Sequence, residues 1–339
     1  MSVAVNITRR SIVSGALKAS ALCAVIGLPA CTPRLQGKFT ASDTHPSDYP
    51  TVQAVKQLGE KLSARTNGRL GLQVYSGGQL GNERDTLEIT TFGGIDINRV
   101  FAAPLNSIEP MTIPPNLPFI FESIPHMRRS LDSEVGDQIL ASLEPHGLIG
   151  LCFYDSGARS FYNTRGPIRT PADMDGLKLR VPNSDLYIAM VNALGANAVP
   201  IPFAEIYQSL AQGVIDGAEN NWPSYDSARH YEVAGHISLT QHLLTPEILV
   251  MSKVTWDGLS SEDQLLIRKT AKESVPYMRE LWDEREARSR AAVIADGAKV
   301  NEVDQALFSE KMLNVWDEFI VTAEQRDVVE KILTMRGEP

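Results

Sequence analysis

The chain has 339 residues, with 41 acidic against 32 basic side chains and a formal net charge of −9 at pH 7. The first 30 residues contain three basic and no acidic side chains, so the remainder carries 29 basic and 41 acidic side chains, a net charge of −12. This acidic balance argues against nucleic acid as a partner, and the length suffices for two domains with separate cores.

The first part of the chain has the pattern of an export signal. Arg9 and Arg10 are twin arginines, and the stretch from there to residue 30 is apolar or small, with only Lys18 charged. It is short and ends in small residues, which favours a cleaved twin-arginine or general export signal over a membrane span. The residues up to Cys31 resemble a bacterial lipobox, so Cys31 is either lipidated or close to an ordinary cleavage site. We expect residues 31–37 to form a tether and the protein to work in the periplasm.

Strands and helices alternate after the tether. Hydrophobic periodicity predicts strands at 38–42, 69–75, 95–101 and 148–154, and helices from Pro50 through residue 62, at 83–92 and at 127–143. Residues 155–158 are expected to form a turn that lets the chain cross between domains. His45 and Tyr49 lie in a polar turn before Pro50 and are candidates for lining a pocket, with capping or packing as the alternative.

The stretch 159–222 has the rhythm of βαβ units on a mostly parallel sheet. Apolar or β-branched runs at 159–164, 177–181, 198–202 and 214–218 alternate with helical patterns at 185–194 and 204–212. In such sheets ligands bind where strands end, and Arg159 and Arg180 stand at strand ends. A guanidinium binds a carboxylate through two parallel hydrogen bonds, so both arginines are candidate anion ligands, although surface ion pairs are the alternative.

The last third of the chain is mainly helical in pattern. Strands are predicted at 237–239 and 247–252, and Ser260 is placed to cap a helix whose apolar residues recur as far as Trp282. Pro276 is expected to bend this helix rather than end it. The mixed charges at 283–288 are expected to form a solvated helix face.

No arrangement of residues in the sequence is typical of an enzyme. There is no Gly-rich phosphate loop, no paired-cysteine spacing and no metal-ligand spacing among the histidines, so neither metal nor cofactor is expected. Asp216 and Glu219 are candidates for paired catalytic carboxylates, but a turn residue and a strand-end hydrogen-bond acceptor are the simpler interpretation. Cys152 is the one cysteine outside the signal and lipobox, so no disulfide framework is expected.

Several motifs together carry a resemblance to a known family. LKLRVP at 177–182, FAEIY at 203–207 and VIDGAEN at 214–220 follow one another at a spacing that resembles the solute-binding proteins of TRAP (tripartite ATP-independent periplasmic) transporters. YSGGQLGNER at 75–84 is similar to a further family segment, and the likeness extends over roughly residues 38–330. It implies an α/β, two-lobed periplasmic-binding-protein-like fold, with residues 38–156 and 246–285 in lobe I and 157–245 and 286–339 in lobe II. A long helix spanning both lobes would form part of the hinge.

The resemblance also implies a set of ligand-binding residues. Arg180 corresponds to the family's carboxylate-binding arginine, Arg159 to a second arginine of the cleft, and Asn220 to an asparagine that hydrogen-bonds the ligand. Phe203 corresponds to an aromatic residue that packs on the ligand, and Glu83 to an acid suited to hydroxyl groups. The full substrate-binding set that we expect adds residues beside these positions: Asn163, Glu219, Trp222, His45 and Tyr49.

One departure from the family pattern narrows the expected ligand. Sialic-acid-binding members carry a second acid where this chain has Phe101, which argues against sialic acid. The pattern is most similar to members that bind sugar acids, so a hexuronate such as glucuronate or galacturonate is expected, with a C4-dicarboxylate or other carboxylate as the alternative. The implied partners are TRAP membrane permease subunits, and the protein is expected to be a monomer. A ligand-sensing domain and a secreted carbohydrate-active enzyme are the competing functions.

Overall fold

The computed structural model describes residues 37–337, and the predicted export signal and most of the tether lie outside these residues. The described residues contain a nine-stranded mixed sheet with the strand order β2-β1-β3-β8-β4-β7-β5-β6, and β9 pairs with β8 outside this path. The strands are β1 Gly37–Ser42, β2 Leu70–Tyr75, β3 Ile97–Phe101, β4 Leu148–Asn163, β5 Lys178–Val181, β6 Asn197–Pro200, β7 Gly217–Asn220, β8 His236–Ser252 and β9 Lys299–Glu302.

Helices follow most of the strands. They are α1 Pro50–Arg65, α2 Glu83–Thr91, α3 Ile124–Asp132, α4 Glu134–Ser142, α5 Asp185–Ala193, α6 Ile206–Ala211, α7 Trp222–Ser227, α8 Lys253–Asp257, α9 Ser261–Lys272, α10 Val275–Ala295, α11 Gln305–Ser309, α12 Leu313–Phe319 and α13 Ala323–Thr334. None of these helices is both long enough and apolar enough to cross a membrane. The predicted βαβ pattern is confirmed for β5, β6 and β7, because β5 pairs in parallel with the other two, whereas the run predicted at 159–164 belongs to β4 and pairs with β7 antiparallel.

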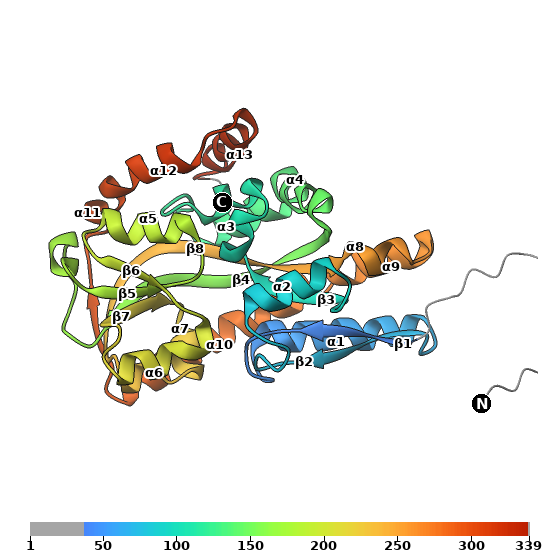
Figure 1. Ribbon diagram of the computed structural model, residues 1–339, viewed down its shortest axis with the longest axis horizontal. Coiled ribbons are helices and arrows are strands. Elements are labelled where there is room, and N and C mark those ends of the chain that lie inside the picture. The colour runs from blue at the N-terminus through green and yellow to red at the C-terminus, as the bar shows by residue number, and fades with distance from the viewer. Residues whose placement is uncertain (1–36, 338–339) are drawn as a thin grey trace, which may run out of the picture. The chain divides into compact units, whose positions relative to one another are not determined.

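A long antiparallel ribbon of β4 and β8 joins two groups of strands (Figure 1). β3 pairs with the end of β8 that contains residues 247–251, whereas β7 pairs with the end of β4 that contains residues 160–163. The helix α10 packs against α1, β4 and α7, and so contacts elements of both groups. The ribbon and α10 are therefore the elements shared by the two halves of the sheet.

The predicted turn at 155–158 is wrong, because β4 continues through it as a bulge. The register of β4 against β8 shifts between Asp155 and Ala158, and Gly157 has a φ of 64°. A bulge places extra residues on one strand without ending the pairing, and glycine takes the left-handed conformation at little cost. The strands predicted at 237–239 and 247–252 are likewise parts of one strand, β8.

Two predicted helices also differ from the structure. The helix expected at 127–143 is interrupted at Ser133, which has extended backbone and accepts a hydrogen bond from the N–H of Val135, and therefore caps α4. Pro276 does not bend a continuous helix, because α9 ends at Lys272 and Pro276 lies in the first turn of α10. Proline is favoured in a first turn, where its missing N–H is not needed. Ser260 caps α9 as predicted, accepting from the N–H of Asp263.

The charged run at 283–288 is only partly a solvated face. Arg285 is buried, and its guanidinium donates to Asp48 at 2.7 Å and to Ser289 at 3.2 Å. Glu286 is half-buried and accepts from the indole N–H of Trp282 at 3.2 Å. The prediction for these two residues was wrong because α10 is covered on more than one side, so charged positions on it meet neighbouring elements instead of water.

Candidate functional site

Two adjoining cavities open at the ends of the strands. The smaller, which we call the inner cavity, has a volume of about 30 Å³ and is lined by Thr44, His45, Glu83, Phe101, Ser156, Arg159, Arg180, Pro182, Phe203, Asn220, Ser224 and Glu247. The larger, the outer chamber, has a volume of about 460 Å³ and shares Thr44, Glu83, Arg180, Pro182 and Phe203 with it. The inner cavity has room for about two water molecules, so a larger ligand would extend into the outer chamber.

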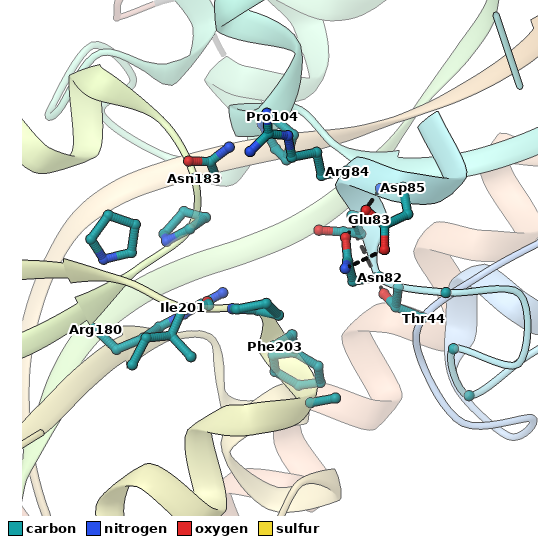
Figure 2. A pocket seen from close by; sticks show the side chains of 17 residues that line it. Thr44, Asn82, Glu83, Arg84, Asp85, Pro104, Arg180, Asn183, Ile201 and Phe203 are labelled. Carbon is teal, nitrogen blue, oxygen red and sulfur yellow. Dashed lines mark hydrogen bonds between the residues drawn. The ribbon is translucent and has the colours of Figure 1, made fainter. Parts of the chain in front are cut away.

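The lining residues come from five neighbouring strands. In sheet order, β3 contributes Phe101, β8 Glu247, β4 Arg159, β7 Asn220 and β5 Arg180. The loop and helix residues Thr44 and Glu83 face Arg180, Ile201 and Phe203 across the outer chamber (Figure 2). Charged and polar side chains are thus distributed along one line across the sheet.

Arg180 is a buried cation without an acidic partner. Its side chain is next to the strand end at Val181, is 5% exposed, and donates through Nε to the carbonyl oxygen of Ile201 at 2.7 Å. It forms no ion pair within residues 37–337. Burial lowers the pKa of Arg180 to about 10 and the neighbouring Arg159 adds to this effect, although the negative charge of Glu219 opposes it. A desolvated guanidinium of this kind favours the arrival of an anion.

Arg159, in contrast, is fully paired. It is 4% exposed, and its Nε and Nη2 donate to the two carboxylate oxygens of Glu219 at 2.5 and 2.8 Å. Its Nη1 donates to Asn220 Oδ1 at 2.9 Å, and the guanidinium lies 4.6 Å from the centroid of the Phe101 ring. Arg159 therefore positions Asn220 and brings little net charge to the cavity.

Glu219 is held ionised behind the cavity. Burial alone would raise the pKa of Glu219, but Arg159 and His242 hold it at about 2. His242 Nε2 lies 3.7 Å from Glu219 Oε2, and the imidazole stacks on Phe161 with ring centroids 4.1 Å apart. A carboxyl group with so low a pKa is a poor proton donor at neutral pH.

A cluster around Arg99 was missed at the sequence level. The guanidinium of Arg99 is completely buried and contacts three carboxylates: it bonds Asp43 and lies 3.0 Å from both Glu83 and Glu247. It also lies 2.6 Å from His45 Nδ1. The signal was a basic residue in the middle of the apolar run of β3, where an unpaired charge is too costly to bury.

The Arg99 cluster has an excess of acidic groups. Burial raises the pKa of Glu247, and the nearby Asp43 and Glu83 add to this effect, although Arg99 opposes it. Burial alone would raise the pKa of Asp43, but Arg99 and His45 lower it, and the result lies well below the usual range of an aspartate. One guanidinium thus faces three carboxyl groups, so further negative charge is unfavourable at this end of the cavity.

The structure brings together six of the residues expected from the sequence. Arg180, Arg159, Asn220, Glu83, Phe203 and His45 all line the inner cavity. Glu219 lies directly behind them as the partner of Arg159. His45 and Phe203 have ring centroids 5.5 Å apart, so the segment containing His45 meets the segment containing Phe203 across the cavity.

Three other candidates line neither cavity. The Tyr49 hydroxyl lies 2.9 Å from Ser224 Oγ, and its ring stacks on His45 at 3.9 Å. Asn163 accepts hydrogen bonds from the backbone N–H groups of Arg165 and Gly166, and Trp222 is buried in a separate apolar cluster with Tyr162 and Tyr225.

Asp216 and Glu219, the candidate pair of catalytic carboxylates, have different partners near the two ends of β7. Asp216 accepts from Arg165 and from the N–H of Lys178 just before β7, whereas Glu219 binds Arg159 near the other end of that strand. Within the described part of the chain no group of three or more His, Cys, Asp or Glu side chains is arranged to hold a metal ion. Cys152 is buried, with a free thiol.

Comparison with known proteins supplies the family context. The family model described as bacterial extracellular solute-binding protein, family 7 (DctP), matches residues 41–322. A TRAP periplasmic solute-binding protein from Bradyrhizobium sp. BTAi1, solved in complex with galacturonate, is 48% identical, covers 88% of this chain and 100% of its own, and has a TM-score of 0.87. The 2,3-diketo-L-gulonate-binding periplasmic protein YiaO of Escherichia coli K12 is 35% identical over 79% of this chain and 82% of its own.

One relative has been solved in two states. The TRAP periplasmic solute-binding protein of Citrobacter koseri with bound D-glucuronate is 34% identical, covers 87% of this chain and 98% of its own, and has a TM-score of 0.85. Its apo, open structure is 33% identical over 88% and 99% of the two chains and has a TM-score of 0.78. The present fold is therefore more similar to the ligand-bound state than to the open one.

Proposed function

Because the chain belongs to the DctP family of bacterial extracellular solute-binding proteins, family 7, we propose that it captures a hexuronate and delivers it to TRAP permease subunits in the cytoplasmic membrane. The family works in the periplasm, and galacturonate or glucuronate is bound in the similar structures. The observation that carries the proposal is the buried, unpaired guanidinium of Arg180 at one end of a polar cavity.

We place the ligand carboxylate against Arg180. Its Nε donates to the carbonyl oxygen of Ile201, which leaves the two Nη groups to donate parallel hydrogen bonds to the carboxylate. Asn220, held by Arg159, and Glu83 would bind hydroxyl groups, and the half-buried ring of Phe203 would pack on the sugar. Since the inner cavity is smaller than a sugar ring, the ligand would displace lining side chains or extend into the outer chamber.

Binding would be accompanied by closure of two lobes. We propose residues 38–156 and 246–285 as lobe I and residues 157–245 and 286–339 as lobe II. Two of the three proposed boundaries fall at the bulge of β4 and near the segment of β8 that pairs with it, and the third, between residues 285 and 286, lies within α10. The greater similarity to a ligand-bound relative than to its open form supports motion between such states.

The proposed role is capture without turnover. Glu219 has a pKa of about 2, unsuited to a general acid at neutral pH, and Asp216 is bonded at the far side of the same strand. The proposal also includes the predicted export signal and either lipidation of Cys31 or ordinary cleavage near it. These residues lie outside the described part of the chain.

Thermal unfolding with a panel of acids tests this function. Galacturonate or glucuronate should raise the melting temperature, because a ligand that binds only the folded state stabilises it. Succinate, N-acetylneuraminate and neutral galactose should have smaller effects. A larger effect of succinate than of either uronate would refute the uronate proposal, and release of any product from a uronide would refute the binding role.

A further inference from the structure

Glu247 is a buried carboxyl group of the inner cavity that the proposed binding scheme does not use. It is 1% exposed and lies on β8 opposite Phe101 of β3. Its Oε2 is 3.0 Å from Arg99 Nη1, yet this oxygen accepts no well-oriented hydrogen bond from the described residues. A buried carboxylate oxygen with unused hydrogen-bonding capacity is costly unless a ligand or water completes it.

Glu247 and Arg180 stand on opposite sides of the site. The sheet order β8-β4-β7-β5 puts two strands between them. Neighbouring strands are about 4.8 Å apart, so the two backbones are separated by roughly 14 Å. Two long side chains reaching inward over this distance leave room for one small molecule whose two ends contact both.

The two ends of the site have opposite electrostatic character. At the β5 end, Arg180 is a cation without a counter-ion, and Arg159 beside it is neutralised by Glu219. At the β3 and β8 end, Arg99 alone faces the carboxyl groups of Asp43, Glu83 and Glu247. A ligand with one carboxylate and several hydroxyl groups matches this field, because its hydroxyls can donate to the surplus acceptors.

Building on the proposed function, we propose that Glu247 determines specificity by accepting a hydrogen bond from a hydroxyl at the end of the ligand away from its carboxylate, and by excluding a second carboxylate there. The site thus selects sugar acids with one carboxylate against aldarates, which carry a carboxylate at both ends. Juxtaposed like charges at an interface are strongly unfavourable.

The test compares galacturonate with galactarate, the corresponding six-carbon diacid, by calorimetric titration. In the parent protein, galactarate should bind about 100-fold or more weakly than galacturonate, as expected for the close approach of like charges. Glu247→Gln keeps the size and an acceptor oxygen but removes the charge. It should weaken galacturonate binding and reduce the ratio of the two dissociation constants at least tenfold. Because the ligands also differ in shape, the change in this ratio between the two proteins reports the charge.

Glu284→Gln is the matched control, since Glu284 is an exposed acid on α10, and its ratio should equal that of the parent. An unchanged ratio in folded Glu247→Gln overturns the inference, and so does a folded variant that binds neither ligand, because the amide should retain hydroxyl binding. If Glu247→Gln does not fold, the parent protein alone tests the inference, and similar affinities of the parent for galacturonate and galactarate overturn it. A parent that binds neither galacturonate nor glucuronate refutes the proposed function instead.

Discussion

The two arginines of the inner cavity should respond to substitution with opposite changes in stability. Arg159 and Arg180 are 4% and 5% exposed, so burial alone does not distinguish them. Arg159 is paired with Glu219, whereas Arg180 has only a carbonyl oxygen as partner for its Nε. We consider replacement of each by methionine, which retains most of the apolar stem and removes the charge.

The expected magnitude for Arg180 follows from its pKa. Burial is the main cause that lowers this pKa from the ordinary value of an arginine to about 10. Because the folded-state value of this base lies below its unfolded value, the charged form destabilises the fold at every pH below 10, by about 3 kcal/mol as an upper estimate. Arg180→Met should therefore raise the melting temperature measured without ligand, by at most a few degrees because an opened cleft hydrates Arg180.

Arg159→Met should have the opposite effect. It leaves the carboxylate of Glu219, which is 0% exposed, without its main partner. Breaking one member of a buried ion pair typically destabilises a protein by about 3–5 kcal/mol. Thermal unfolding without ligand, followed by circular dichroism, gives both values, and an equal decrease for the two variants would show that Arg180 is compensated in the unliganded fold.

Titration of the same variants with uronate tests the ligand assignment. Loss of one partner of a desolvated charge pair costs about 2–5 kcal/mol, so Arg180→Met and Arg180→Ala should bind roughly 30-fold or more weakly. Arg180→Lys should recover little, because an ammonium group cannot make two parallel hydrogen bonds. Arg288→Ala removes an exposed charge on α10 and should change affinity by about twofold at most. A folded Arg180→Ala that binds like the parent would place the carboxylate elsewhere.

Three further predictions concern stability and motion. The pKa of Glu219 is about 2 against an ordinary 4.5, so its ionisation stabilises the fold above pH 4.5, and this contribution should be lost as the pH falls towards 2. Glu219→Gln should unfold at a lower temperature than the parent at neutral pH. Between pH 5 and 2 it should lose less stability than the parent. Gly157→Ala should lower the melting temperature, because φ is 64° and an added Cβ would lie 3.0 Å from the Trp282 ring. Gly166→Ala is the control and should be nearly neutral, because no heavy atom lies within 4 Å of an added Cβ there. Equal effects of the two substitutions would refute the argument. Uronate should reduce the radius of gyration in small-angle scattering, Arg180→Ala should show no such change at the same ligand concentration, and an unaltered radius in the parent would contradict lobe closure.

The strand ends of the second half of the chain were predictable because local pattern and sheet topology agree there. Arg180 closes a short alternating strand, and Asn220 ends another, so the parallel order of β5 and β7 brings both to one edge. Glu83, the first residue of a helix that Asn82 caps through the N–H of Asp85, was expected only from the resemblance to the family. The places of Arg180 and Asn220 at strand ends depend mainly on secondary structure and its order.

The Arg99 cluster was not predictable, because its members come from distant segments. Asp43 follows β1, Glu83 is the first residue of α2, Arg99 lies on β3 and Glu247 on β8, and only the folded sheet brings them together. Alternation shows that Arg99 faces one side of a strand but does not show that the side is covered. The same limitation explains Arg285, whose helix pattern appears solvated until the partner Asp48 is in place.

The continuity of β4 and β8 was missed because Gly157 and its neighbours have the composition of a turn. Turn composition and bulge composition are similar, since both use residues that tolerate a left-handed backbone. The interruption at Ser133 illustrates the converse, because Ser133 ends one helix and caps the next without any proline. Tertiary contacts decide whether such a segment is a turn or a bulge, and whether a helix continues or stops, and these contacts cannot be read from local periodicity.

The long ribbon also determines how the protein opens to solvent. β4 pairs with β8 from Leu148 to Asn163, and each half of the sheet is hydrogen-bonded to this same pair of strands. The hydrogen bonds between β4 and β8 therefore lie inside the sheet, with β3 paired to one side of the ribbon and β7 to the other. Amide hydrogens within the ribbon should therefore exchange with deuterium only through global unfolding, while those of the short edge strand β6 exchange through local opening. The two halves should thus behave as a single cooperative unit in unfolding, even though we propose that they move as separate bodies around a ligand.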